Sequence, residues 1–175
     1  MINELRTSPT DAWAWDKTDT KQVAYPGLKE LVYDYDLERL AMKRAAEIAL
    51  SYEHTRPNGQ NPFTIYTEEN ITRLDTGENI AVASPNVYSK AEAVNNGWRE
   101  DNEPYAGQGH RRNMLGYKFT CVGVGHVTYN GYDYWVEEFA SRPSINTTET
   151  PANDSEQTVT VSVTKILITN YNTWL

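Results

Sequence analysis

The chain has 175 residues, a length that suits one well-buried domain and is short for two. Its formal net charge of −8 argues against a nucleic-acid partner, because phosphate backbones are bound by clustered Lys and Arg side chains. No apolar run is long enough to span a bilayer. The single cysteine, Cys121, excludes an internal disulfide and a cysteine-based zinc cluster.

The first part of the chain carries weak signals. Residues 2–6, Ile-Asn-Glu-Leu-Arg, predict a short helix. Residues 8–26 show no hydrophobic period and are predicted to form a loop, from which Trp13 and Trp15 dock onto the body of the protein. The N-terminus has neither the apolar core nor the cleavage site of an export signal.

A clear helical pattern begins at Asp36, which is a suitable N-cap. Apolar residues at helical spacing predict a helix whose last turn contains His54, because residues 57–59, Pro-Asn-Gly, stop it there. Arg44 lies on the apolar stripe and therefore needs a buried acceptor. His54 either interacts with the helix dipole or is placed at this chain break to contact a ligand.

A second helix and a hairpin follow. Residues 89–92, Ser-Lys-Ala-Glu, form a capping box, and the helix carries Glu100 near its end. Residues 119–140 predict a hairpin around Asn130-Gly131, a favoured two-residue turn. In this register His126 faces Trp135, and the glycines at 123 and 125 leave one strand face bare for another element to pack on.

The C-terminal part is predicted to be less compact. Residues 141–157 are polar, contain proline and are predicted to be a linker. Residues 158–175 are predicted to carry a trailing β-strand, which either joins the main sheet or begins a further module.

Four side chains are candidates for chemistry: His54, His110, Glu78 and Glu100. His110 lies beside Gly109, so both histidines neighbour chain-breaking residues. Local spacing shows no H-E-x-x-H, G-x-S-x-G or P-loop motif. From these residues alone we expect an α/β domain with a His/Glu cleft.

The order of several segments is more informative. HTRPNG, GENIA, WREDNEPY, GHRRNMLGYKFTCVGVG and YWVEEFA follow one another in residues 28–140. This ordered set resembles the CAP superfamily of cysteine-rich secretory proteins, antigen 5 allergens and pathogenesis-related class 1 proteins, and above all its bacterial SCP-like extracellular branch. The chain departs from the animal and plant members because it lacks their disulfides and has the inserted 8–26 loop.

The resemblance implies an α+β fold, a three-layer α-β-α sandwich with a central, mostly antiparallel sheet, formed by residues 1–140. It also implies a cleft tetrad of His54, Glu78, Glu100 and His110, with Glu103 as a competitor for the third position. His54 and His110 would bind Zn2+ or another divalent cation, while the two glutamates orient the rings or hold a water. The alternative is that the four side chains only hydrogen-bond one another.

The function implied by the resemblance is that of a secreted, non-enzymatic binding module for a lipid, a peptide or a cell-surface ligand. We therefore expect an extracellular protein whose signal peptide is absent from this chain. One alternative is a metal-dependent hydrolase with Glu78 or Glu100 as general base. Another is an interaction domain of a larger cell-surface protein.

Overall fold

The computed structural model describes residues 1–84 and 91–149. In chain order the elements are α1 (Ile2–Thr7), β1 (Trp13–Trp15), β2 (Gln22–Ala24), β3 (Val32–Tyr33), α2 (Tyr35–Leu50), α3 (Thr64–Glu68), β4 (Thr76–Ala83), α4 (Ala91–Arg99), the 3-10 turn η1 (Tyr105–Gly107), α5 (Gly109–Met114), β5 (Cys121–Tyr129) and β6 (Tyr132–Ala140). Among the described residues, no helix is both long and apolar enough to cross a membrane.

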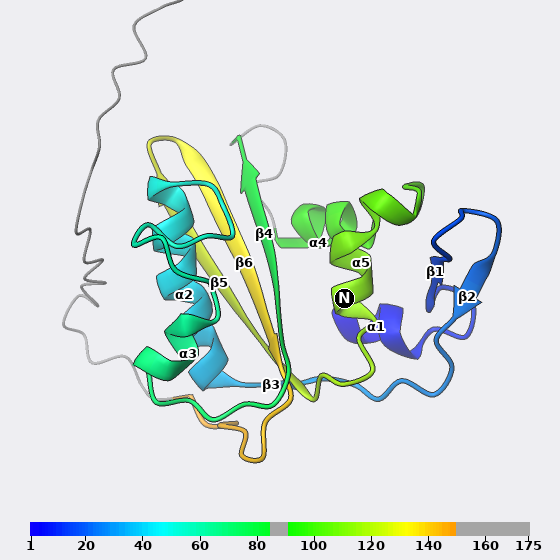
Figure 1. Ribbon diagram of the computed structural model, residues 1–175, viewed down its shortest axis with the longest axis horizontal. Coiled ribbons are helices and arrows are strands. Elements are labelled where there is room, and N and C mark those ends of the chain that lie inside the picture. The colour runs from blue at the N-terminus through cyan, green and yellow to red at the C-terminus, as the bar shows by residue number, and fades with distance from the viewer. Residues whose placement is uncertain (85–90, 150–175) are drawn as a thin grey trace, which may run out of the picture.

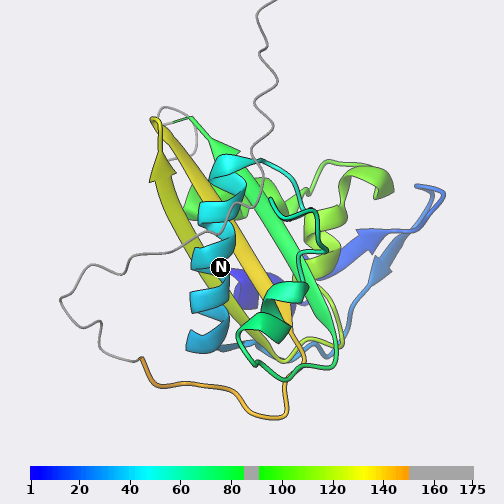
Figure 2. The same ribbon diagram turned by 60° about the vertical axis from the view of Figure 1, so that its left-hand side comes forward.

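The molecule is a sandwich of three layers. Within the described part of the chain, the central sheet has four strands in the order β3-β5-β6-β4, of which only β3 and β5 pair in parallel. Helices α2 and α3 cover one face, and α1, α4 and α5 lie on the other side (Figures 1 and 2). This arrangement confirms the predicted α+β sandwich with a mostly antiparallel sheet.

The β5–β6 hairpin has the predicted register. Tyr129 pairs with Tyr132 across the turn, and both residues of Asn130-Gly131 have positive φ angles of 50° and 77°, as a type I′ turn requires. His126 pairs with Trp135, and their rings stack with centroids 4.0 Å apart. Local turn chemistry therefore fixes the two longest strands of the sheet.

Helix α2 packs on the bare strand face that the two glycines of β5 provide. A Cβ atom added at Gly123 would lie 2.2 Å from backbone atoms of Leu37 and Glu38, and one added at Gly125 would lie 2.1 Å from the carbonyl carbon of Ala41. The predicted close approach is confirmed, and it sets the distance between the helix and the sheet.

We expect Gly125→Ala to lower the free energy of unfolding by about 3 kcal/mol, because the new methyl group must push α2 away from β5. Urea unfolding of the variant measures this. Gly109→Ala is the matched control, since no atom lies within 4 Å of the methyl group it would add. Equal stability of the two variants would contradict the packing argument.

The ends of α2 differ from the sequence prediction. The N-cap is Asp34, whose carboxylate accepts a hydrogen bond from Asp36 N at 2.9 Å, so the assignment of Asp36 as N-cap was wrong. The helix ends at Leu50, and His54 lies beyond its last turn. Arg44 Nη2 donates to the carbonyls of Glu53 and His54 at 3.3 and 3.0 Å, which holds the chain after the helix.

Residues 8–26 contain secondary structure that the prediction of a loop missed. Strands β1 and β2 form a small antiparallel sheet beside α5 (Figure 1). Trp15 N donates to Gln108 Oε1 at 2.7 Å, and the buried Arg111 guanidinium lies 4.6 Å from the Trp13 ring centroid. The two tryptophans therefore dock onto the body, as predicted.

The segment after β6 begins as part of the domain. The Arg142 guanidinium pairs with Asp34 and Asp36, and Asn146 O accepts from Tyr35 N at 2.9 Å. Residues 141–146 of the predicted linker thus pack against the start of α2. The rest of the predicted linker beyond 149 and the predicted strand at 158–175 lie outside the described residues, as do Ser89 and Lys90 of the capping box.

Candidate functional site

His54 and Glu78 form the first histidine–carboxylate pair. His54 Nδ1 lies 2.7 Å from Glu78 Oε1. Glu78 is buried on β4, whereas the His54 side chain is 55% exposed. The imidazole is therefore held through Nδ1, which leaves Nε2 as the ring nitrogen for another partner.

A buried guanidinium lies behind Glu78. Arg44 Nε donates to Glu78 Oε2 at 2.6 Å, and Arg44 Nη1 donates to Glu47 Oε2 at 2.6 Å. The acceptor predicted for Arg44 is thus confirmed. Burial alone would raise the pKa of Glu78, but the hydrogen bonds from His54 and Arg44 outweigh it, and the pKa is lowered. Glu78 is therefore a carboxylate, so His54 Nδ1 carries the proton and donates it.

Two further acids, Glu137 and Glu138, lie on β6, and both side chains are buried. Burial, together with the nearby Glu78 carboxylate, raises the pKa of Glu138 well above its usual range, and Tyr66 Oη donates to Glu138 at 3.0 Å. Burial raises the pKa of Glu137 to about 8, although Asn79 Nδ2 donates to it at 2.9 Å. Burial therefore favours the protonated form of both side chains.

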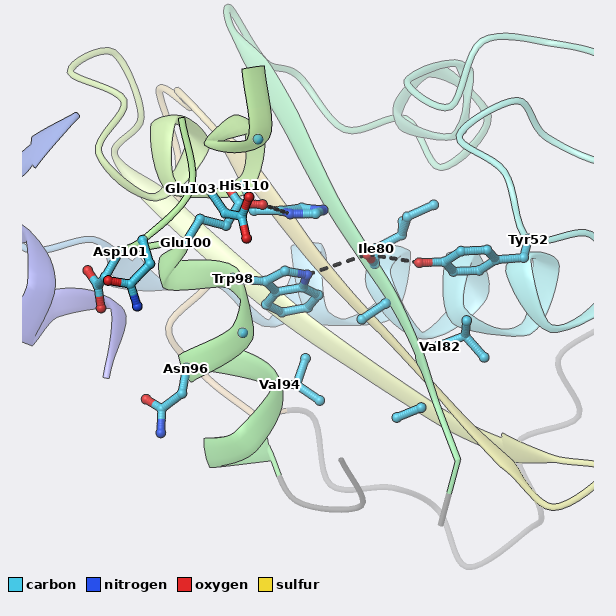
Figure 3. Close-up of a pocket in the computed structure, with 15 residues that line it drawn as sticks. Tyr52, Ile80, Val82, Val94, Asn96, Trp98, Glu100, Asp101, Glu103 and His110 are labelled. Carbon is cyan, nitrogen blue, oxygen red and sulfur yellow. Dashed lines mark hydrogen bonds and ion pairs between the residues drawn. The ribbon is translucent and has the colours of Figure 1, made fainter. Parts of the chain in front are cut away.

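His110 and Glu100 form the second pair, on the other side of β4. His110 Nδ1 is hydrogen-bonded to Glu100 Oε1, and Arg111 N donates to Glu100 Oε2 at 3.1 Å. Glu100 follows the end of α4 with a positive φ of 49°. The centroid of the His110 ring, on α5, lies 6.0 Å from the centroid of the Trp98 ring, on α4. Both helices therefore help to position this pair (Figure 3).

Hydrogen bonds through Asn79 and Asn113 connect the two histidine–carboxylate pairs across β4 and α5. Asn113 Nδ2, on α5, donates to the Glu78 carbonyl at 3.2 Å and to Asn79 Oδ1 at 2.8 Å. Asn79 Nδ2 in turn lies 3.3 Å from the His110 carbonyl, to which it donates. A continuous set of amide hydrogen bonds therefore links the strand that carries one pair to the helix that carries the other.

A cavity of about 500 Å³ opens beside the second pair and is here called the β4 cavity. It is lined by residues 80–83 of β4, by α4 and by residues 100–103 of the following segment. Figure 3 shows Glu100, Glu103 and His110 gathered near one end and Tyr52 and Val82 away from them. Of the predicted tetrad, Glu100 and His110 are in this lining; among the described residues His54 and Glu78 are not.

The described residues offer few side chains that could bind a metal ion. Within residues 1–84 and 91–149, no three His, Cys, Asp or Glu side chains are grouped closely enough to hold a metal ion. The two histidines present similar donor atoms, because each Nδ1 is bound to a carboxylate and each Nε2 is left for another partner. His126 is separate, since its Nε2 is hydrogen-bonded to Asp133 at 2.9 Å.

Sequence reasoning missed several buried polar residues around the predicted tetrad. Glu47 also accepts from the buried Arg56 guanidinium, whose Nη2 lies 2.6 Å from Glu47 Oε1. A signal for the acids on β6 was present: adjacent glutamates, Glu137 and Glu138, interrupt an otherwise apolar strand pattern. Such a pair within a buried strand indicates protonated or ion-paired carboxyl groups.

Solved structures with a similar fold are known from several organisms. NaASP2 with Zn2+ has a TM-score of 0.56 at 20% identity, over 83% of this chain and 77% of that one. An outer surface protein from Borrelia burgdorferi has a TM-score of 0.54 at 22% identity, over 66% and 80% of the chains. An extracellular SCP-domain protein from Bacillus anthracis str. Ames has a TM-score of 0.53 at 23% identity, over 66% and 35%. These likenesses show a shared fold.

Sequence comparison gives the family. The protein YkwD of Bacillus subtilis (strain 168) is 28% identical over 146 residues, which are 80% of this chain and 52% of that protein. The chain thus spans about half the length of this relative. The family model of the cysteine-rich secretory protein family, CAP, matches residues 1–139. The chain therefore belongs to the cysteine-rich secretory protein (CAP) family.

Proposed function

We propose that this chain is an extracellular CAP-domain binding module whose histidines take a divalent cation and whose β4 cavity takes a lipid or peptide. The observation that carries the proposal is the shared geometry of His54 and His110. Each ring is fixed through Nδ1 by a glutamate, and this orientation leaves Nε2 as the ligand atom. The extracellular location is supported by two structural relatives, one of which is an extracellular protein and the other an outer surface protein.

Imidazole is a ligand type that suits zinc, and because the described residues group no three His, Cys, Asp or Glu side chains, the proposal counts on the two histidines alone as protein ligands. Zinc binds neutral imidazole, and carboxylates that hold the opposite ring nitrogen are usual partners of zinc-bound histidines. One structural relative was solved with Zn2+. His54 and His110 would supply protein ligands, and solvent would complete the coordination.

A hydrolase using the same site is the less favoured alternative. A general base needs a carboxylate that is free to accept a proton from water. Glu78 is already bound by Arg44 and His54, and Glu100 by His110 and the Arg111 amide. Zinc-dependent cleavage of a peptide pool that is lost in Glu100→Gln would favour the hydrolase. An interaction domain of a larger cell-surface protein is a further proposal.

We expect calorimetry to show zinc binding that weakens by about tenfold or more in His54→Ala and in His110→Ala. Affinity should fall as the pH is lowered, because protons compete with zinc for neutral imidazole. Glu100→Gln should weaken binding less, since it changes only the partner of a ligand.

His126→Ala is the matched control, because this histidine is held by Asp133 on the β5–β6 hairpin. Its zinc affinity should equal that of the wild type. Equal affinities in the wild type and all three alanine variants would reject the assignment of His54 and His110.

A further inference from the structure

The β4 cavity has walls of two different characters. Along β4 and α4 the lining is mostly apolar, with Ile80, Val82, Val94 and Trp98. Val82 remains 38% exposed in spite of its place in the sheet. The far end is formed by residues 100–103 and His110, and it is polar. A complementary ligand therefore combines an apolar part with a polar or charged part.

The sign of the charge at the polar end is negative. The lining contains the carboxylates of Glu100, Asp101 and Glu103; Arg99 and Arg111 pair with Asp101 and His110 binds Glu100, so the negative charge at this end that no described residue offsets is that of Glu103. The formal net charge of −8 adds long-range attraction for cations. An anionic ligand such as a fatty acid carboxylate would be repelled by this end, and a cationic group would be attracted.

The three carboxylates differ in their availability. Glu100 is bound by His110 and the Arg111 amide, and Asp101 pairs with Arg99 and Arg111. The carboxylate of Glu103 has no hydrogen bond or ion pair to any residue that the structure describes. Glu103 is therefore the acid that can take a cation without breaking an existing pair.

The position of Glu103 depends on a glycine. A Cβ atom at Gly107 would lie 2.9 Å from both Cβ and Oε2 of Glu103, so the absence of a side chain lets Glu103 lie against this turn. The turn is held in place because Gln108 Nε2 donates to the Glu100 carbonyl at 3.1 Å. The segment thus presents Glu103 at a defined place at the edge of the cavity.

We propose that the β4 cavity binds an extended peptide segment in which a Lys or Arg side chain pairs with Glu103 and neighbouring apolar side chains pack against β4 and α4. This inference rests on the proposed function, since it assigns a ligand class to the same cleft. A wall of four consecutive strand residues, 80–83, spans roughly 13 Å and matches a few residues of an extended chain. Charge complementarity then selects a basic peptide over an acidic one or a fatty acid.

The test uses fluorescence anisotropy of the dansylated, C-terminally amidated peptide Leu-Val-Lys-Val-Leu. We expect saturable binding that weakens as NaCl rises from about 0.05 to about 0.5 M. Peptides with norleucine or glutamate in place of the lysine should bind progressively more weakly. Glu103→Gln should weaken binding of the lysine peptide by about fivefold, and Gly107→Ala should act in the same direction by displacing Glu103.

Glu30→Gln is the matched control, because Glu30 is exposed, lies outside the cavity and has the same effect on net charge. Equal binding of the lysine and norleucine peptides, or equal losses in Glu103→Gln and Glu30→Gln, would overturn the inference. If butylamine competes as strongly as the unlabelled peptide, the peptide inference is wrong and the cavity binds a small cation.

The zinc titration separates this inference from the proposed function. A protein that binds zinc through His54 and His110 but none of the peptides would overturn the peptide inference and leave the metal proposal standing. A protein that binds the lysine peptide with the expected Glu103 dependence, but no zinc, would support the inference and remove the metal proposal.

Discussion

Replacing Arg44 with methionine is expected to lower the free energy of unfolding by about 3–5 kcal/mol at neutral pH. Arg44 is 0% exposed and pairs with two buried carboxylates. Glu47 keeps its second partner, Arg56, whereas Glu78 loses a guanidinium that, together with His54, lowers its pKa. The variant would therefore bury a carboxylate whose remaining side-chain partners are His54 and Glu138. Urea unfolding measures the difference.

The dependence of this stability difference on pH tests whether the ionised Glu78 causes it. Folding lowers the pKa of Glu78, so this group stabilises the folded state above its unfolded pKa and stops doing so as the pH falls through the folded pKa. The wild type loses this contribution in acid, so the gap between it and Arg44→Met should narrow there. Arg39→Met, on the same helix with a 52% exposed side chain, should cost under about 1 kcal/mol. A gap that is constant with pH would contradict this explanation.

Replacing Glu137 with glutamine is expected to stabilise the protein in mildly alkaline solution. Glu137 is 3% exposed, and burial raises its pKa from 4.5 to about 8. Between these values the folded state keeps a proton that the unfolded state has released. Each pH unit then lowers the stability of the wild type by about 1.4 kcal/mol, which sums to on the order of 4 kcal/mol by pH 8. Glutamine has no proton to lose and can still accept from Asn79.

Unfolding in urea at pH 4.5 and at pH 8 tests this expectation. The two proteins should have similar stability at the lower pH, and the variant should be more stable at the higher one. Glu30→Gln, at an exposed position, should leave the difference between the two pH values unchanged. A difference between wild type and Glu137→Gln that does not grow with pH would show that Glu137 is ionised inside the sheet.

The parts of the fold that could be predicted from the sequence depend on neighbouring residues. Asn130-Gly131 determines its own turn, and this turn determines every pair along β5 and β6. Arg44 on an apolar stripe likewise required a buried acid, although the sequence did not say which one. The residues of the predicted tetrad were chosen through the order of motifs. Their pairing, His54 with Glu78 and His110 with Glu100, needed the tertiary structure.

The features that could not be predicted depend on contacts between distant segments. The apolar stripe of α2 continues to Tyr52, so periodicity gave no sign that the helix ends at Leu50. Strands β1 and β2 have three residues each, which is too short for a hydrophobic period to show, and β2 is fully exposed. The raised pKa values of the acids on β6 depend on how completely the surrounding elements exclude water, which no local pattern encodes.

The outer edge of β4 has a consequence for association between copies of the protein. Among the described residues, β4 lies at the end of the sheet order, and a free strand edge can recruit strands from other molecules into aggregates. At its middle, the Ile80 carbonyl accepts from Tyr52 Oη at 3.3 Å and from Trp98 Nε1 at 3.4 Å, so side chains from both sides of the strand cover it (Figure 3). A peptide can lie against the side chains of this wall, but a foreign strand cannot extend the sheet past Ile80 without displacing two aromatic rings.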